Sequence, residues 1–183
     1  MSRTYLILFN DLPIDKTSVK RGENAPQVVT AARSVNVALF LSKDLRRDVT
    51  ISLGMVKESE WNIISFPGAT LRRVSPDERS ISFFLLKAFE VLDRMTKGMT
   101  RTLDNGIVIQ RLDPIEYLQP WGENIYLAKM EGQDPIKSDE PVNSIYIYDI
   151  DDKVSLDGIK WRTISRPKTP ERFILDINVI YDP

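Results

Sequence analysis

The chain of 183 residues contains no cysteine and no histidine. These absences exclude disulfides and metal sites built on thiolates or imidazoles. They also exclude nucleophile pairs of the Ser-His and Cys-His types. Any proton transfer must therefore rely on carboxylates, lysines, tyrosines or water.

An excess of charge of one sign is also missing, because 25 Lys and Arg stand against 26 Asp and Glu and leave a net charge of -1. No general basic field attracts nucleic acid, so an RNA site would depend on local clusters. With 42% hydrophobic residues, 8 Gly and 11 Pro, the composition is that of a soluble globular protein. The length predicts one domain over residues 1–183.

Long hydrophobic runs are absent as well. The apolar segments at residues 5–9 and 83–86 are too short for a signal peptide or a membrane span. We therefore expect a cytoplasmic protein without membrane association.

Hydrophobic periodicity predicts strands mixed with helices, which favours an α/β domain. In the first half we expect a strand over residues 5–9, a polar surface loop through Asn24, a helix over 26–41 and strands over 49–55 and 61–66. Alternation in the strand from Val49 predicts that only one of its faces packs on the core.

The clearest predicted helix begins at Ser75 and runs to Gly98. Ser75 at the N-cap, Pro76 at the first helical position and Glu78 three residues after the cap form a capping box. Beyond Gly106, the β-rich segments predict strands over residues 107–110, 125–129, 144–148, 161–164 and 173–180.

Residues 42–48 form a charged cluster that contains Lys43, Asp44, Arg46, Arg47 and Asp48. Cations after a helix interact favourably with its C-terminal dipole, which would by itself account for them. Two adjacent arginines also suit phosphate oxygens, with the two aspartates orienting them, so an anion or an RNA backbone is the functional alternative.

A second cluster covers residues 71–79, where helix capping accounts for most of the polar residues. Arg79 is the exception, because a cation in the first turn opposes the helix dipole. Its position hints at a partner or an anionic ligand.

Three further segments each follow a predicted strand: residues 130–132, 148–149 and 165–167. Turn chemistry alone accounts for such residues. Ligands of open α/β sheets usually bind at the carboxyl ends of strands, so these loops could together wall a cofactor pocket.

The motifs resemble a known family. The segments at 38–49 (ALFLSKDLRRDV) and 74–80 (VSPDERS), with their spacing, look like the signature of the archaeal tRNA pseudouridine N1-methyltransferases, which belong to the SPOUT methyltransferases. Shorter matches are found at residues 106–108, 111–112 and 124–127, and the last of these leads into 130–132.

The resemblance implies an α/β fold with a C-terminal trefoil knot, a homodimer, and S-adenosylmethionine bound against the knot loops. Its implied partner is tRNA or another structured RNA, methylated on N1 of a T-arm pseudouridine. By match, the cofactor-binding residues would be Leu127, Met130, Glu131, Gly132, Tyr148, Asp149, Ser165 and Arg166.

The same resemblance places several cations at the RNA or at the dimer partner: Arg33, Lys43, Arg46, Arg47 and Arg79. A methyltransferase needs alignment of the base nitrogen with the methyl group and removal of the N1 proton. A carboxylate can accept that proton. Asp48 is the first candidate for this base and Asp44 the second.

The chain departs from the family pattern at positions that bear on activity. A Gly-Arg-x-Asp motif is replaced by residues 26–29 (PQVV), and a Gly-Asp-His-x-Gly loop by 148–152 (YDIDD). Arg166 and Pro167 stand where relatives carry a small or apolar residue. Two hypotheses follow: an active S-adenosylmethionine-dependent RNA methyltransferase, or a catalytically degenerate paralogue that acts as an RNA-binding or protein-interaction module.

Overall fold

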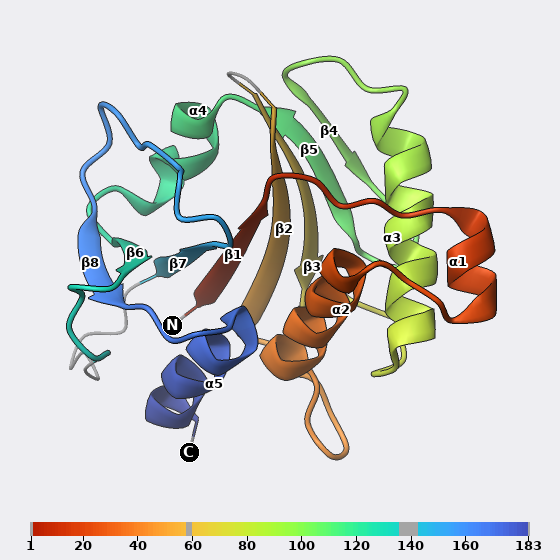
Figure 1. Ribbon diagram of the computed structural model, residues 1–183, viewed down its shortest axis with the longest axis horizontal. Helices are drawn as coiled ribbons and strands as arrows, with labels where there is room; N and C mark the ends of the chain where they lie inside the picture. The colour runs from red at the N-terminus through yellow and green to blue at the C-terminus, as the bar shows by residue number, and fades with distance from the viewer. Residues whose placement is uncertain (1, 58–59, 136–142, 183) are drawn as a thin grey trace.

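The computed structural model describes residues 2–57, 60–135 and 143–182. Its strands form a single sheet in the order β4-β5-β3-β2-β1-β7-β6-β8 (Figure 1). The neighbours among β2, β1, β7, β6 and β8 are parallel, whereas β3, β5 and β4 continue the sheet in antiparallel pairs. The strands are β1 (Arg3–Phe9), β2 (Val49–Lys57), β3 (Glu60–Pro67), β4 (Met99–Thr102), β5 (Val108–Leu112), β6 (Ile125–Lys129), β7 (Ser144–Asp149) and β8 (Arg162–Ser165).

Helices cover the sheet unequally, and the mixture of helices and strands confirms the predicted α/β class. Helices α2, α3 and α5 pack on one face, while the short α4 and the 3₁₀ turn η1 pack on the other (Figure 1). The helices are α1 (Lys16–Arg21), α2 (Pro26–Leu39), α3 (Glu78–Leu92), α4 (Pro114–Leu118), η1 (Gln119–Trp121) and α5 (Pro170–Tyr181).

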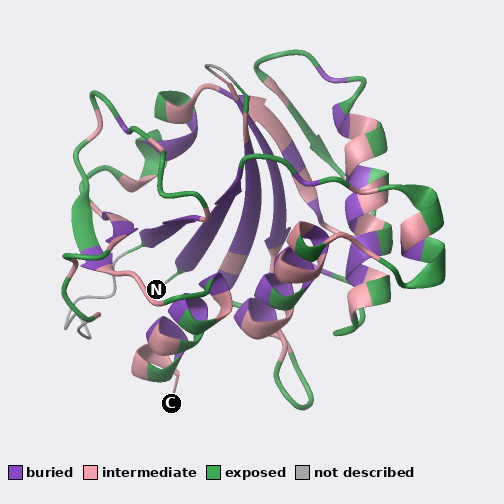
Figure 2. Ribbon diagram, viewed as in Figure 1, coloured by how far each residue is buried: buried purple, intermediate pink, exposed green. Residues whose placement is uncertain are grey.

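Strand β1 lies in the middle of the sheet, and all seven of its residues are buried (Figure 2). Its neighbour β2 is buried on both faces too, because Ser52 and Gly54 lie beneath a second core on the α4 side. The expectation of one buried face for β2 was therefore wrong. The sequence of β2 still alternates, because the buried residues on its second face are the small Ser52 and Gly54, which lie against Tyr117 and Leu8.

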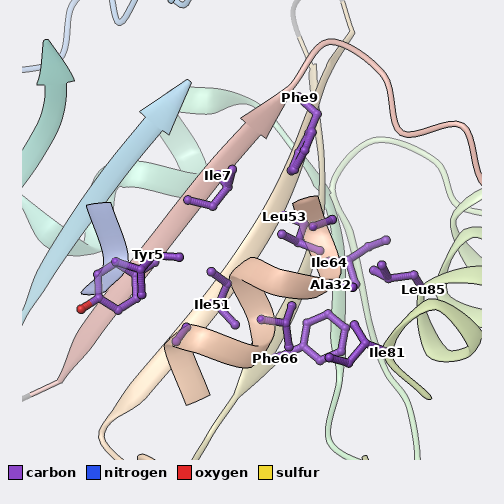
Figure 3. Packing of buried hydrophobic residues seen from close by; sticks show 14 of the residues in the cluster. Tyr5, Ile7, Phe9, Ala32, Ile51, Leu53, Ile64, Phe66, Ile81 and Leu85 are labelled. Carbon is purple, nitrogen blue, oxygen red and sulfur yellow. The ribbon is translucent and has the colours of Figure 1, made fainter. Parts of the chain in front are cut away.

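The larger core lies between the sheet and the helices (Figure 3). Phe66 of β3 meets Ile81 of α3 there, while Ala32 brings the α2 backbone close to the sheet. At about 25 cal/mol per Å² of buried apolar surface, this core is the main stabilising contribution to the fold.

The predicted start of α3 at Ser75 is corrected by the structure, which begins the helix at Glu78 with Asp77 as its N-cap. The Asp77 carboxylate accepts a hydrogen bond from the Ser80 amide at 2.8 Å. The Ser75 amide instead donates to the Ser80 hydroxyl, so Ser75 belongs to the approach of the helix. The helix also ends at Leu92, six residues before Gly98.

A second correction concerns residues 173–180, which form most of helix α5 and not a strand. Phe173, Ile174 and Ile177 are buried at helical spacing. Thr169 caps the helix by accepting from the Arg172 amide, and Pro170 occupies the first turn. The β-branched residues of this segment suggested a strand, but its cap and its period are helical.

Other differences are smaller. Helix α1 interrupts the loop predicted before Asn24, and β4 and α4 were not foreseen. Helix α2 ends at Leu39, two residues before the expected end. No helix among the described residues is both long and apolar enough to cross a membrane.

The parallel strands give the sheet two distinct edges. The amino edge is where β1, β2 and β7 begin, and the carboxyl edge is where they end. The strand order changes direction between β1 and β7. From β1 the chain continues to β2 on one side, whereas β7 and β6 lie on the other side of β1. Ligands of α/β sheets bind at such points.

Candidate active site

Three loops leave the carboxyl edge: the first loop (residues 130–133), the second loop (149–153) and the third loop (165–167). The first and third loops are joined by a hydrogen bond from the Ser165 amide to the Gln133 carbonyl at 2.7 Å. A side chain on Gly132 would collide with the backbone of Ile164. Only glycine permits this approach.

The second loop is tied to the other two. Lys129, the last residue of β6, forms an ion pair of 2.6 Å with Asp152. Arg166 Nη2 donates to the Ile150 carbonyl at 3.1 Å. The structure therefore brings together the three loops that the sequence singled out.

The Asp149 carboxylate is engaged by its own loop. It accepts hydrogen bonds from the amides of Asp151, Lys153 and Val154, the last two at 2.6 and 2.7 Å. Asp149 is buried, and these bonds satisfy its charge inside the protein. Its contribution is to fix the path of the second loop.

Tyr148 points towards α5, where its ring lies 5.4 Å from that of Phe173. The Arg166 guanidinium lies over the Tyr148 ring, 4.2 Å from its centroid. Burial raises the pKa of the Tyr148 hydroxyl, although the nearby Arg166 opposes this shift. The protonated hydroxyl donates to the Pro167 carbonyl at 2.8 Å, so Tyr148 supports the third loop from below.

One donor at this junction lacks a partner. Within the described part of the chain, Arg166 Nη1 is buried and has no hydrogen-bond partner. Met130 and Glu131 are exposed beside it in the first loop, whereas Leu127 is buried in β6. A polar, partly anionic ligand would satisfy the arginine, and loop backbones of this kind can contact a nucleoside.

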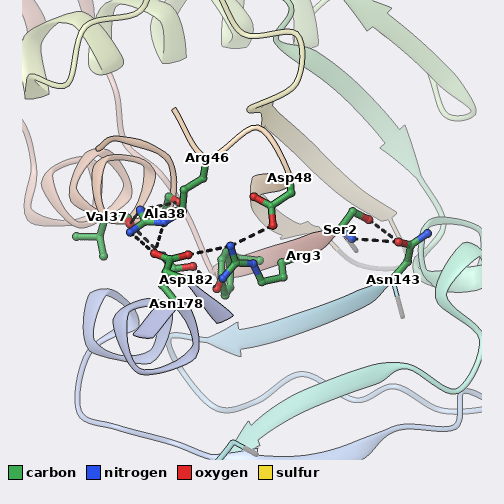
Figure 4. A network of polar contacts seen from close by, with 10 residues as sticks. Ser2, Arg3, Val37, Ala38, Arg46, Asp48, Asn143, Asn178 and Asp182 are labelled. Carbon is green, nitrogen blue, oxygen red and sulfur yellow. Dashed lines mark hydrogen bonds and ion pairs between the residues drawn. The ribbon is translucent and has the colours of Figure 1, made fainter. Parts of the chain in front are cut away.

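Charged side chains gather at the amino edge around Asp182, which follows α5 (Figure 4). Asp182 accepts from Arg3 Nη2 at 3.0 Å and from Arg46 Nε at 2.7 Å. Arg3 also donates to Asp48 at 3.2 Å. We call Arg3, Arg46, Asp48 and Asp182 the amino-edge network.

Arg46 also donates to the Val37 and Ala38 carbonyls near the end of α2, at 3.0 and 3.3 Å. The helix-terminus interpretation of the charged cluster therefore describes Arg46 well. Its side chain is only 13% exposed, so little of it is accessible to an external anion.

The rest of this cluster is open to solvent. Arg47 is 55% exposed, donates to the Gly68 carbonyl and pairs with Asp44 at 3.3 Å. A backbone bond from Leu45 and the charge of Arg47 hold the pKa of the Asp44 carboxyl below its ordinary value. Lys43 is exposed.

The two remaining predicted RNA contacts lie on the helices. Arg33 of α2 lines a cavity of about 460 Å³ together with Glu78 and Glu171. Arg79 is exposed in the first turn of α3. The cavity beside Arg33 also reaches Thr169, which follows the third loop by two residues.

The predicted catalytic aspartates and the predicted cofactor loops occupy opposite edges. Asp48 precedes Val49, which pairs with Arg3, whereas Asp149 pairs with Leu8. At about 3.3 Å per residue, these six rows put Asp48 about 20 Å from the second loop. Within one chain the structure does not bring them together.

Two features of the edges were missed from the sequence. Asp182 gave no local signal, because its partners are far away in the chain. Asn62 of β3 is 5% exposed at the carboxyl edge, and Oδ1 of this asparagine is unpartnered among the described residues. A polar residue between Trp61 and Ile63, both buried, was the available signal.

The fold and the loops define the class of protein. A solved structure of Archaeoglobus fulgidus Nep1 bound to S-adenosylhomocysteine has a TM-score of 0.58, with coverage of 100% of this chain and 98% of that one. The identity is 12%, so this likeness concerns the fold alone. The chain has the mixed α/β fold of that protein.

Sequence comparison identifies the family. Residues 15–159 match the family model described as "Putative SAM-dependent RNA methyltransferase". The tRNA (pseudouridine(54)-N(1))-methyltransferase of Methanocaldococcus jannaschii is 35% identical over 147 residues, which cover 73% of this chain and 71% of the relative. The chain belongs to this family of S-adenosylmethionine-dependent RNA methyltransferases.

Two further relatives carry the same name. The protein of Methanococcus aeolicus is 38% identical over 106 residues, and that of Haloferax volcanii is 34% identical over 110 residues. These matches cover 56% and 60% of this chain, and 50% and 54% of the respective relatives. They agree with the resemblance seen in the motifs.

Proposed function

We propose that this protein is an S-adenosylmethionine-dependent methyltransferase acting on N1 of pseudouridine in tRNA. The observation that carries the proposal is the convergence of the three loops at the carboxyl edge. The names of the relatives support the substrate.

The residues at the junction fit the cofactor. The backbones of the first and third loops, held together at Gly132, and the unpartnered Arg166 Nη1 would hold it. Tyr148 and Asp149 would act indirectly, by supporting the third and second loops. When bound, S-adenosylmethionine supplies a methyl group already activated on a sulfonium sulfur.

The chain itself has to hold the target base in line with that methyl group and accept the N1 proton. Asp48, with Asp44 as second candidate, remains our proposal for the proton acceptor. The separation of about 20 Å means that either aspartate would have to come from a second subunit.

A homodimer would provide that second subunit. Leu175 and Val179 are 44% and 70% exposed on α5. They are four residues apart and so share one face of the helix. We propose that this face contributes to the dimer interface. We also propose that four cations bind tRNA on the surface of the dimer: Arg33, Lys43, Arg47 and Arg79. Arg46 would hold the segment before β2 in place.

We also propose that the C-terminal segment forms a trefoil knot. Strand β7 lies between β1 and β6, yet the next strand, β8, pairs with the far side of β6. The chain then returns to α5, which packs on α2. This crossing of the chain beside the first loop supports a knot.

A cytoplasmic location is a separate part of the proposal. It follows from the proposed tRNA substrate of the enzyme.

Calorimetry with S-adenosylmethionine tests the proposal. We expect saturable binding by the wild-type chain and weaker binding by Arg166→Ala, because the unpartnered donor is lost. Transfer of labelled methyl to a T-arm RNA that carries pseudouridine, against the same RNA with uridine, tests the reaction. No heat and no thermal shift at millimolar cofactor would overturn the proposed function.

The degenerate-paralogue hypothesis has its own supporting observation. Gln27 and Val29 replace the Arg and Asp of the family motif, and the Tyr148 ring fills space that a glycine would leave open. RNA binding without cofactor binding would favour this second candidate.

A further inference from the structure

A second hollow opens at the carboxyl edge, between the ends of β1 and β2, the start of β3 and the end of α3. It has a volume of about 320 Å³, at the lower end of the range of small-molecule sites. Its apolar lining comes from Leu12 and Met55 of the sheet side and from Phe89 and Leu92 of α3. Such walls can pack against the faces of a planar ring.

Asn62 is one of the polar residues that line this cavity. It pairs with Met55 on one side and with Arg111 on the other, so the three side chains form a row across the sheet on the face that α3 covers. Asn62 Oδ1 is buried without a hydrogen-bond partner in the described part of the protein. An unpaired buried amide is costly, and a ligand with an N–H group would remove that cost.

The charges around the cavity balance. Asp11 and Asp93 face Lys57 and Arg111 among its lining residues. Arg111 is fixed by Nε donating to Glu60 at 2.7 Å and Nη1 donating to the Met95 carbonyl at 2.9 Å. Two acids and two bases favour a neutral polar ligand over a phosphate.

We propose that this cavity binds a uracil-type base and receives the target base of the reaction. Asn62 Oδ1 would accept from the N3–H of the ring, and its Nδ2 would donate to the neighbouring C4 carbonyl. Enzymes that modify bases extrude them into pockets and bind them in this manner. That the bound base is the target of the reaction rests on the proposed function.

The position of the cavity agrees with that role. Asn10 lines it and also lines a smaller hollow with Asp149 and Lys153 of the second loop. The Ile150 amide donates to the Leu8 carbonyl at 3.0 Å, which joins the ends of β7 and β1. With N3 and C4 of pseudouridine held by Asn62, N1 stays free to react.

Nucleotide binding without cofactor tests the inference separately from the proposed function. The probes are uridine, N3-methyluridine and cytidine 5′-monophosphates, followed by NMR on ¹⁵N-labelled protein. The side-chain amide signals of Asn62 are assigned by their absence from Asn62→Leu. We expect millimolar uridine monophosphate to shift them. The N3-methyl analogue should bind about tenfold more weakly, as for the loss of one hydrogen bond, and Asn62→Leu should bind uridine monophosphate more weakly still, because it removes both hydrogen bonds.

Asn105→Ser is the matched control, because Asn105 is also buried with an unpartnered amide nitrogen but does not line the cavity. It should bind uridine monophosphate as the wild type does. Asn62→Leu should keep or raise the melting temperature, since it removes an unsatisfied group. Equal binding of the three nucleotides, or unchanged affinity in Asn62→Leu, would overturn the inference, whatever the result with S-adenosylmethionine.

Discussion

The two edges of the sheet are built in different ways. At the amino edge, the amino-edge network joins charged side chains from β1, the segment before β2 and the end of α5. At the carboxyl edge, the contacts between the loops run mostly through the backbone, and Asn62 and Arg166 keep polar atoms unpartnered among the described residues. Ion pairs between side chains hold the amino edge and backbone contacts hold the carboxyl edge. Both edges keep buried polar atoms without partners among the described residues, because Arg3 Nε and Nη1 at the amino edge also lack them.

Asp182→Ala should produce the largest loss of stability, because it removes a carboxylate shared by Arg3 and Arg46. The Arg3 side chain is 3% exposed and would keep only Asp48 as an anionic partner in the network. Removing one partner of a buried pair costs about 3 kcal/mol. Urea denaturation measures this loss.

Asp176→Ala is the control on the same helix, since the Arg172–Asp176 pair is exposed. We expect it to cost less than about 0.5 kcal/mol. Equal effects of the two substitutions would show that the amino edge does not depend on the buried pair.

The same carboxylate predicts a pH dependence. Burial disfavours its charge, but hydrogen bonds from Arg46 and Arg3 outweigh burial and hold the pKa of Asp182 below the ordinary value of 3.8. Its contribution is therefore complete above that value and is lost as the pH falls through the lower, folded-state pKa. Wild type should lose more stability than Asp182→Asn in acid, and parallel acid titrations of the two would contradict this expectation.

Gly132→Ala should damage the carboxyl edge, because the added carbon meets the Ile164 backbone, which cannot rotate away. We expect a loss of about 2 kcal/mol in stability, as for overpacking, and a clear loss of cofactor affinity. Thermal denaturation and calorimetry measure the two effects. Met130→Ala in the same loop should leave stability unchanged, since Met130 is 78% exposed.

Tyr148→Phe should have a smaller effect. It deletes the hydrogen bond to Pro167 and keeps the ring in contact with Arg166 and Phe173. The expected cost is about 1 kcal/mol by urea denaturation. No change in stability, with cofactor affinity also unchanged, would mean that Tyr148 does not support the third loop.

Replacing Lys43 and Arg47 by alanine should change stability only modestly, by about 1 kcal/mol, because both are exposed and the main loss is the hydrogen bond from Arg47 to the Gly68 carbonyl. RNA affinity should fall, and the slope of its logarithm against the logarithm of salt concentration should decrease by about 0.7 to 0.9 for each lost phosphate contact. Filter binding with a T-arm RNA measures this slope. An unchanged slope would show that Lys43 and Arg47 at the amino edge do not contact the RNA.

Local patterns in the sequence predicted most of the parallel sheet and helix α2. They failed at α5, where β-branched residues outweighed the cap at Thr169 and the helical spacing of Phe173 and Ile177. They also misplaced the start of α3, because both Ser75 and Asp77 can cap a helix and only the path of the chain selects Asp77.

The candidate site was predictable in part. Residues that follow strands share an edge once the strands are parallel, so the grouping of the three loops could be inferred. The pairing of Arg46 with Asp182 could not, because it joins residues 136 positions apart. Asn62 was detectable only as a polar interruption of an apolar strand, and its row with Met55 and Arg111 depends on the sheet register.

The hydrogen bond from Arg3 to Asp182 spans 179 positions and has a consequence for biosynthesis. Strand β1 is synthesised before the other described strands, yet its buried arginine meets Asp182 only after α5 has been translated and packed. Contacts of such separation form late and slowly. The strand that is synthesised before the others is thus completed last, and a nascent chain that pauses before α5 leaves Arg3 without Asp182 and Tyr5 without Asn178.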